Sequence, residues 1–168
     1  SLTTLAGNFG EDDLLILAVP TLAMKSVLSE CQEHVPPSVT ITDVASVKTK
    51  IIEFAEQVNG DIPKNFVPGH PIAGSEKSGI NAANPDLFKN HKVVLTPKEM
   101  TCQGHINKVI DIWTRLGADV TFMTADDHDR IFAATSHLPH YLAYSLVDTL
   151  SRDSNASEIF DHAAGGFK

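Results

Sequence analysis

Apolar and polar residues along the first 123 positions follow a pattern typical of strands that alternate with helices. Apolar runs predict strands at 13–19, 39–43, 91–97 and roughly 118–123, with another short strand within NFVPGH. Apolar residues three and four positions apart predict helices at 21–34, 47–60 and 106–117, and Gly60 and Gly117 are suited to end the last two. On the first helix, this spacing places Leu22, Val27, Leu28 and Cys31 toward one side. The alternation predicts an α/β fold with a mostly parallel sheet.

The pattern changes after Thr124. The segment DDHDRIFAATSHLPHYLAYSLVDTL is helical in its spacing, interrupted only by Pro139, and no further strand pattern follows it. We therefore predict a domain boundary near 123–125, with an α/β domain at 1–123 and the beginning of an all-α domain at 124–168.

Composition and charge narrow the class of protein. The chain is 42% hydrophobic and 20% charged, as in ordinary globular proteins, and its net charge is −8. No stripe of Lys and Arg offers a surface to nucleic acid. No targeting segment is visible, and the longest apolar run, LLILAV, is too short to span a membrane. We expect a soluble cytoplasmic protein in which Cys31 and Cys102 are buried, reduced thiols.

A glycine-rich turn of the type GxGxxG is missing before the first predicted strand. Doubly wound nucleotide-binding sheets normally open with such a turn, which holds the pyrophosphate of the dinucleotide. Gly7 and Gly10 lie in a polar stretch instead. The sequence therefore indicates either a different α/β protein or a chain that begins inside a larger one.

Three segments follow predicted strands at the edge where parallel sheets bind ligands, namely AVPT (18–21), TDVASVK (42–48) and GHPIAGSEKSG (69–79). Ser46 falls where a helix begins, so its hydroxyl either caps that helix or hydrogen-bonds a substrate or a catalytic histidine. His70, restrained by the following proline, either holds the loop backbone or accepts a proton from an alcohol. Ser75 and Glu76 lie on a glycine-flanked loop that suits a gate over a ligand, although solvated loop charges are the commoner explanation.

A third group of candidates lies in TADDHDRIFAATSHLPHYL. Ser136 can cap a helix whose first turn holds Pro139, which would place His137 and His140 on one face near the positive end of the helix dipole. That arrangement suits a carboxylate ligand, and His128 reaches the same pocket if the chain kinks near Ser136. A metal site is the rival interpretation, but HLPH is not HExxH and no ligand set of known geometry results. Unrelated surface histidines are the third interpretation.

Taken in order, DVASVK, GHPIAGSEKSG, KVVLTP, HDRIFAATSHLPHYLAYSLVD and AAGGFK resemble the motifs of the prephenate/arogenate dehydrogenase family of tyrosine biosynthesis. The resemblance runs from about residue 13 to the last residue, and HPIAGSEKSG together with SHLPH makes it specific. It implies a Rossmann-like, doubly wound dinucleotide-binding domain whose second part is 1–123, and a helical substrate-binding and dimerisation domain beginning at 124. It also implies NAD or NADP as cofactor, a homodimer, and a cyclohexadienyl substrate of dicarboxylate or amino-acid type that undergoes oxidative decarboxylation.

The resemblance also implies roles for individual residues. His70 would take the proton of the ring hydroxyl, and Ser46 would orient it. The resemblance further implies that one group of residues binds the substrate and that a second group contacts the cofactor. The substrate set is Ser75, Glu76, His128, His137, His140 and Lys168, and the cofactor set is Val19, Pro20, Thr21 and Ala45.

Two departures from the family pattern bear on activity. The glycine-rich cofactor loop is missing, and so is the family's arginine shortly after GGFK. We therefore expect the chain to be an interior fragment that does not bind cofactor normally or turn over. The rival interpretations are another Rossmann hydroxyacid dehydrogenase and a catalytically silent binding or regulatory domain.

Overall fold

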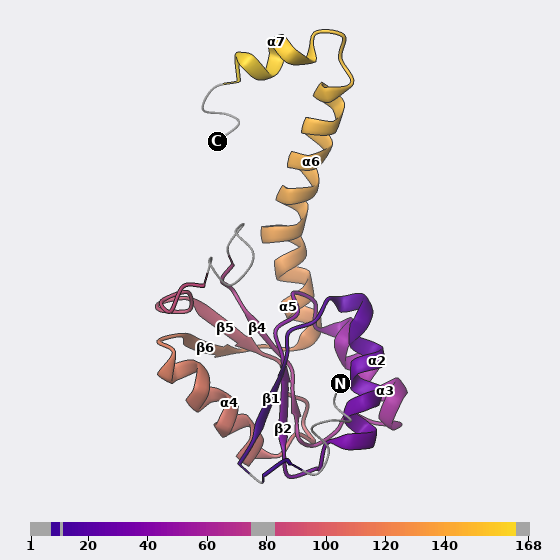
Figure 1. The fold of residues 1–168 in the computed structure, drawn as a ribbon, viewed down its shortest axis with the longest axis vertical. Helices are drawn as coiled ribbons and strands as arrows, with labels where there is room; N and C mark the ends of the chain where they lie inside the picture. The colour runs from indigo at the N-terminus through magenta and orange to yellow at the C-terminus, as the bar shows by residue number, and fades with distance from the viewer. Residues whose placement is uncertain (1–7, 11, 75–82, 164–168) are drawn as a thin grey trace. The chain divides into compact units, whose positions relative to one another are not determined.

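The structure is a computed structural model that describes residues 8–10, 12–74 and 83–163 (Figure 1). The chain divides into two compact units, residues 1–129 and residues 130–168. Strands and helices alternate in the first unit, which confirms the predicted α/β class. In chain order its elements are β1 (Leu14–Leu17), α2 (Thr21–His34), β2 (Thr40–Asp43), α3 (Thr49–Asn59), β3 (Phe66–Val67), β4 (Gly69–Pro71), β5 (Lys92–Leu95), α4 (Gln103–Arg115) and β6 (Asp119–Phe122), followed by α5 (Ala125–Phe132), which runs into the second unit.

The strand pairings are mostly parallel, as predicted. β1 pairs with β2 and β2 with β3 in parallel, and β5 pairs with β6 in parallel, whereas β4 and β5 are antiparallel. NFVPGH therefore gives two short strands rather than one. They are separated by Pro68, which lacks an N–H to donate and offers its carbonyl to the amide of Thr96. The antiparallel pair aligns Gly69 with Leu95 and His70 with Val94.

The strands form two three-stranded sheets, in the orders β1–β2–β3 and β4–β5–β6, and helices lie on both sides of the strands (Figure 1). Figure 1 shows α2 and α3 on one side and α4 on the other. Fully buried side chains of α2, α3 and the first three strands form one apolar core, which includes Met24, Ile51 and Phe66. Residues of β5 and α4 form a second core around Val109 and Trp113. The two cores fix the strands from both sides, so the strand ends that carry the polar segments are held firmly.

Two predictions about side-chain burial were wrong. Leu22 is 95% exposed, because the buried stripe of α2 runs through Met24, Leu28 and Cys31 at intervals of four and three, and position 22 lies off that stripe. Cys102 is exposed, because it occupies the N-cap position of α4 in an extended conformation. Cys31 is buried as predicted, and burial, together with nearby Glu30, raises the pKa of its thiol to about 11.

The helix ends at Gly60 and Gly117 agree with the sequence. Both glycines have φ of 81°, the left-handed conformation that residues with a side chain rarely adopt. Gly60 is the C-cap of α3, and its amide donates to the carbonyl of Glu56. These two glycines therefore end α3 and the turn after α4 at the predicted positions.

The helical segment after Thr124 contains a π-helical turn. Residues Ala133–His137 form this turn, labelled η2, between α5 and α6 (Leu138–Ser151), and α7 (Ala156–Asp161) follows. Ser136 therefore does not cap α6, contrary to prediction; it lies inside the π turn, and the N-cap position belongs to His137 in helical conformation. A wider turn at this point accommodates Pro139, which has no N–H to donate and whose ring crowds the preceding turn.

Within the described residues, no helix is long and apolar enough to cross a bilayer.

Candidate functional site

The carboxyl ends of β1, β2 and β3 meet at one edge of the sheet. The parallel register aligns Leu17 with Asp43 and Thr42 with Val67, so the segments that leave these strands begin side by side. The amide of Val44 donates to the carbonyl of Leu17 at this edge. Open parallel sheets bind their ligands here, because the loops diverge beyond the strand ends.

A buried ion pair joins two of these segments. The Nζ of Lys48 contacts Oδ2 of Asp43, and both side chains are completely shielded from solvent. Lys48 Nζ also donates to the carbonyl of Gly69 at 2.6 Å. The carboxylate of Asp43 accepts from the amide of Ala45 at 2.9 Å and from the amide of Gly69 at 3.2 Å. The pair thus hydrogen-bonds both the amide and the carbonyl of Gly69, the residue directly before His70.

Burial opposes both charges of this pair. It raises the pKa of Asp43 and lowers the pKa of Lys48, while the attraction between them works against both shifts. Removing two ions from water costs several kcal/mol per ion, roughly, and only close pairing with further hydrogen bonds offsets that cost. The four contacts described above provide this compensation.

Gly69 is required here by space rather than by backbone conformation. A Cβ at this position would lie 3.1 Å from the carbonyl oxygen of Asp43 and 3.2 Å from a methyl group of Leu95. Backbone atoms of β2 cannot move aside without breaking the strand pairing. The close approach of the two segments is therefore possible only because residue 69 has no side chain.

Two histidines and a carboxylate are linked in a line at this edge. His70 Nδ1 lies 2.8 Å from His128 Nε2, and His128 Nδ1 lies 2.8 Å from Oδ1 of Asp129. The two rings meet edge to face, with centroids 5.0 Å apart. The His128 side chain is fully buried, whereas His70 is half-buried. Asp129 is half-buried as well, so the fully buried His128 joins two partly accessible groups.

Asp129 also supports the start of α3. Its carboxylate accepts from the amides of Lys48 and Thr49 at 2.8 and 2.9 Å, which satisfies N–H groups that have no partner within the helix. The N-cap position of α3 is Lys48, with no side-chain cap bond, so Ser46 is not the cap and the capping interpretation of that serine was wrong. The cap comes from a residue 81 positions later in the chain.

The environment sets the charge states of the histidine and the carboxylate. Burial lowers the pKa of His128 and outweighs the opposing hydrogen bond from Asp129, so the imidazole is neutral at pH 7. Burial alone would raise the pKa of Asp129, but the hydrogen bonds from Lys48, His128 and Thr49 lower it overall. Asp129 is therefore an ionised acceptor near neutral pH.

The residues predicted to touch a cofactor lie at the same edge. Val19 and Pro20 follow β1, and α2 begins directly after them at Thr21. Ala45 follows β2, and its amide is fixed by Asp43. Ser46, next in the chain, has an exposed side chain. The parallel register brings the loops after β1 and β2 together, but the contacts of these residues with a cofactor stay a prediction.

The other predicted residues are not joined to this cluster by any described contact. His137 and His140 belong to the second unit, where both are exposed. Ser75, Glu76 and Lys168 lie outside the described residues. Their roles stay predictions.

Known proteins similar to this chain cover both units. Residues 6–122 match the family model "Prephenate dehydrogenase, nucleotide-binding domain", and residues 124–168 match "Prephenate dehydrogenase, dimerization domain". The chain belongs to the prephenate dehydrogenase family.

Individual relatives agree with this assignment. A cyclohexadienyl dehydrogenase of Zymomonas mobilis is 35% identical over 94% of the chain and 54% of its own length. The prephenate dehydrogenase of Aquifex aeolicus, solved with hydroxyphenyl propionate and NAD+, is 34% identical, with a TM-score of 0.86 over 99% of this chain and 57% of its own. An arogenate dehydrogenase from Synechocystis is 30% identical, with a TM-score of 0.77 over 99% of this chain and 58% of its own. The chain thus spans about half the length of the relatives it matches.

Sequence reasoning gave no role to Asp43 or Lys48, and it considered Asp129 only as one of several possible metal ligands. One signal was available, because Asp43 is the last residue of the strand predicted at 39–43, and an ionisable residue there is expected to face the ligand edge. Its partner Lys48 carries no pattern of its own. The metal alternative gains no support, because the described part of the chain contains no group of three or more His, Cys, Asp or Glu side chains placed to hold an ion.

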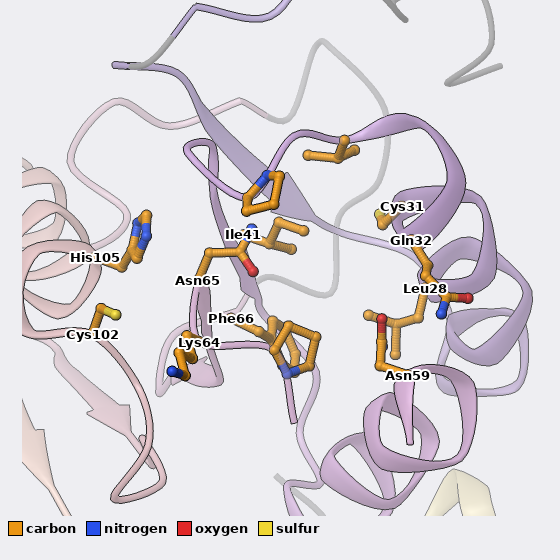
Figure 2. A pocket seen from close by; sticks show the side chains of 13 residues that line it. Leu28, Cys31, Gln32, Ile41, Asn59, Lys64, Asn65, Phe66, Cys102 and His105 are labelled. Carbon is orange, nitrogen blue, oxygen red and sulfur yellow. The ribbon is translucent and has the colours of Figure 1, made fainter. Parts of the chain in front are cut away.

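A cavity of about 530 Å³ lies at the opposite, amino-terminal ends of β2 and β3 (Figure 2). Leu28, Cys31 and Phe66 give it a largely apolar lining. Three of its polar side chains have protein partners: Asn65 donates to the carbonyl of Val39, Asn59 donates to the carbonyl of Ala55, and His105 Nδ1 lies 2.7 Å from the hydroxyl of Thr40. We assign no ligand to this cavity.

The buried pair generates a stability prediction. Replacing Lys48 with Met leaves the Asp43 charge buried without a cation, and we expect the free energy of unfolding to fall by about 3–5 kcal/mol. Lys50→Met is the matched control, since Lys50 is exposed and pairs with Glu53 at the surface, where such a bridge contributes about 0–1 kcal/mol. Urea unfolding monitored by circular dichroism measures both. Equal losses in the two variants would show that the Lys48–Asp43 pair has no special weight.

Proposed function

We propose that the full-length protein catalyses the NAD(P)+-dependent oxidative decarboxylation of prephenate, arogenate or both, giving 4-hydroxyphenylpyruvate or tyrosine. Family membership supports the reaction class. The observation that carries the proposal is the line of His70, His128 and Asp129 at the carboxyl edge of the sheet, anchored through Gly69 by the Lys48–Asp43 pair. This is an arrangement for removing a proton at a fixed position.

In the proposed reaction, His70 is the general base. It takes the proton of the ring hydroxyl while the carbon that bears this hydroxyl loses a hydride. The bond to the ring carboxylate then breaks, its electron pair enters the ring, and carbon dioxide leaves. Aromatisation favours the products, so the protein mainly has to align the reacting groups and accept one proton.

The described residues fit a dinucleotide. The parallel register brings the loops after β1 and β2 together at the ligand edge, and α2 begins there at Thr21. The N-terminus of a helix favours a negatively charged ligand. Val19, Pro20, Thr21 and Ala45 would hold the cofactor at this edge. The nicotinamide, when bound, supplies the hydride acceptor.

For the substrate carboxylates we propose His137, His140 and Lys168, and we propose that Ser75 and Glu76 lie near the substrate entrance. Ser46 would contribute a hydroxyl beside the reacting carbon. His128 takes a different part from the one that the sequence suggested. Its side chain is fully buried and is bonded to His70 and Asp129, which favours support of the base over contact with the substrate.

A homodimer is the proposed assembly. Residues 124–168 match a family model described as a dimerization domain. Within the second unit, α6 has large apolar side chains on its surface, as an interface between copies requires. They are Leu138, Tyr141, Leu142, Tyr144, Leu146 and Val147.

The general base is tested with His70→Asn in the full-length protein, which removes the proton acceptor at a similar side-chain size. We expect kcat/KM for prephenate or arogenate, with NAD+ or NADP+, to fall by roughly 10²-fold or more. His34→Asn is the control, since His34 ends α2 at the far edge of the sheet. Reduced nicotinamide is followed by its absorbance at 340 nm.

The outcomes separate the candidate functions. Activity of His70→Asn within a few-fold of wild type would remove His70 from its assigned role. Turnover of a simple hydroxyacid, with neither prephenate nor arogenate accepted, would favour another Rossmann dehydrogenase. A wild-type protein without any activity on these substrates would favour a silent binding domain.

The carboxylate pocket gives a second kinetic prediction. Replacing His137 or His140 with Asn is expected to raise KM about 10-fold or more with kcat little changed, because a hydrogen bond to a charged group contributes about 1.5–3 kcal/mol. His162→Asn, an exposed histidine after α7, is the control. Unchanged KM in both variants would contradict this part of the proposal.

A further inference from the structure

We propose that Asp129 and His128 are positioning residues that hold His70 in the tautomer with hydrogen on Nδ1 and the lone pair on Nε2. The inference rests on the proposed function in taking His70 as the general base. It further identifies Nε2 of His70 as the atom that accepts the proton, and His128 and Asp129 as the residues that keep this nitrogen unprotonated.

The first step concerns the contact between Asp129 and His128. An ionised carboxylate only accepts hydrogen bonds. Asp129 already accepts from two backbone amides of the α3 start, which favours its ionised form. The 2.8 Å contact with His128 Nδ1 therefore places the hydrogen on that nitrogen.

The second step transfers this constraint to His70. A neutral imidazole carries one hydrogen, so with Nδ1 protonated the Nε2 of His128 is an acceptor. Complete burial of the His128 side chain favours this neutral form. The 2.8 Å contact between His128 Nε2 and His70 Nδ1 then requires that His70 donates. His70 is left with its lone pair on Nε2.

The third step follows the proton. When Nε2 of His70 accepts the hydroxyl proton, the ring becomes an imidazolium that still donates from Nδ1 to His128. The negative charge of Asp129 stabilises this cation through the intervening ring, and no second proton has to move. A carboxylate that orients a catalytic histidine in this way contributes strongly to catalysis in the serine proteases, although there it contacts the base directly.

Backbone and ion-pair contacts hold His70, His128 and Asp129 in position relative to one another. Both α3 amides hold Asp129, and the Lys48–Asp43 pair holds the peptide of Gly69 on the other side of His70. Among the described residues, charged groups that act on His128 include Asp129, Lys48 and Asp43. Lys48 and Asp43 have opposite charges, so of these three groups Asp129 has the charge that can balance an imidazolium at His70.

A direct test reads the tautomer without any turnover. Full-length protein labelled with ¹⁵N-histidine is examined by long-range ¹H–¹⁵N correlation at neutral pH, and the His70 signals are assigned by their loss in His70→Asn. We expect the pattern of an Nδ1–H, Nε2-unprotonated ring for His70. The opposite tautomer would overturn the proposal, whatever the activity.

Two substitutions of His128 test the consequence for catalysis. His128→Phe keeps a ring but removes both polar contacts, and we expect kcat to fall about 10-fold or more, with KM little changed and the His70 tautomer no longer fixed. His128→Gln retains an amide oxygen to accept from His70 and an amide N–H to donate to Asp129. We expect it to restore most of the lost activity.

A double-mutant cycle shows whether His128 acts through His70. In the His70→Asn background, adding His128→Phe is expected to change kcat/KM less than twofold, since the base is already absent. A loss that adds fully would indicate a general structural role and contradict the proposal. If His70→Asn is itself fully active, the general-base role of His70 fails and this inference fails with it; if wild type turns over neither prephenate nor arogenate, the proposed function fails; if His70→Asn is inactive while His128→Phe is fully active, only this inference fails.

Discussion

The contact between Lys48 and Asp43 is the interaction on which the rest of the site depends. Two charges that would be strongly solvated in the unfolded chain are buried together, and they remain ionised only while each finds further partners. Gly69 supplies those partners through its amide and its carbonyl. Charge-assisted hydrogen bonds that are shielded from water therefore hold the chain before His70 to the end of β2. These bonds fix the position of His70, the proposed base.

His128, the second histidine, is also held in place by a charged side chain that bonds to backbone groups. The carboxylate of Asp129 accepts from the amides at the start of α3 and contacts His128 Nδ1. It therefore joins the start of α3 to α5 and orients the His128 ring, which contacts His70. Such networks add rigidity only when every member is satisfied, because an unpaired polar group in a buried site is costly. The described groups meet that condition, which explains why a site with several buried charges is compatible with a stable fold.

Much of the fold could be read from the sequence, because long apolar runs and glycine helix ends are local signals. The bounds of α2 and the C-cap at Gly60 follow from such patterns. The site was only partly predictable. His70 and the ligand edge were visible in the strand order, whereas the cap of α3 by Asp129 joins residues 81 positions apart, and no local pattern encodes it. The π turn at Ala133–His137 likewise replaced the expected cap at Ser136, since Pro139 can be accommodated in more than one way.

Amide hydrogen exchange at Gly69 measures whether the Lys48–Asp43 pair holds this residue in place. In the wild-type protein the Gly69 amide donates to the buried Asp43 carboxylate, so its exchange should be slow. Lys48→Met should accelerate that exchange at least about tenfold relative to the Ile41 amide, which lies in the central strand and bonds the carbonyl of Asn65. If NMR gives the same exchange rate for the Gly69 amide in the wild type and in Lys48→Met, the Lys48–Asp43 pair does not hold Gly69 in place.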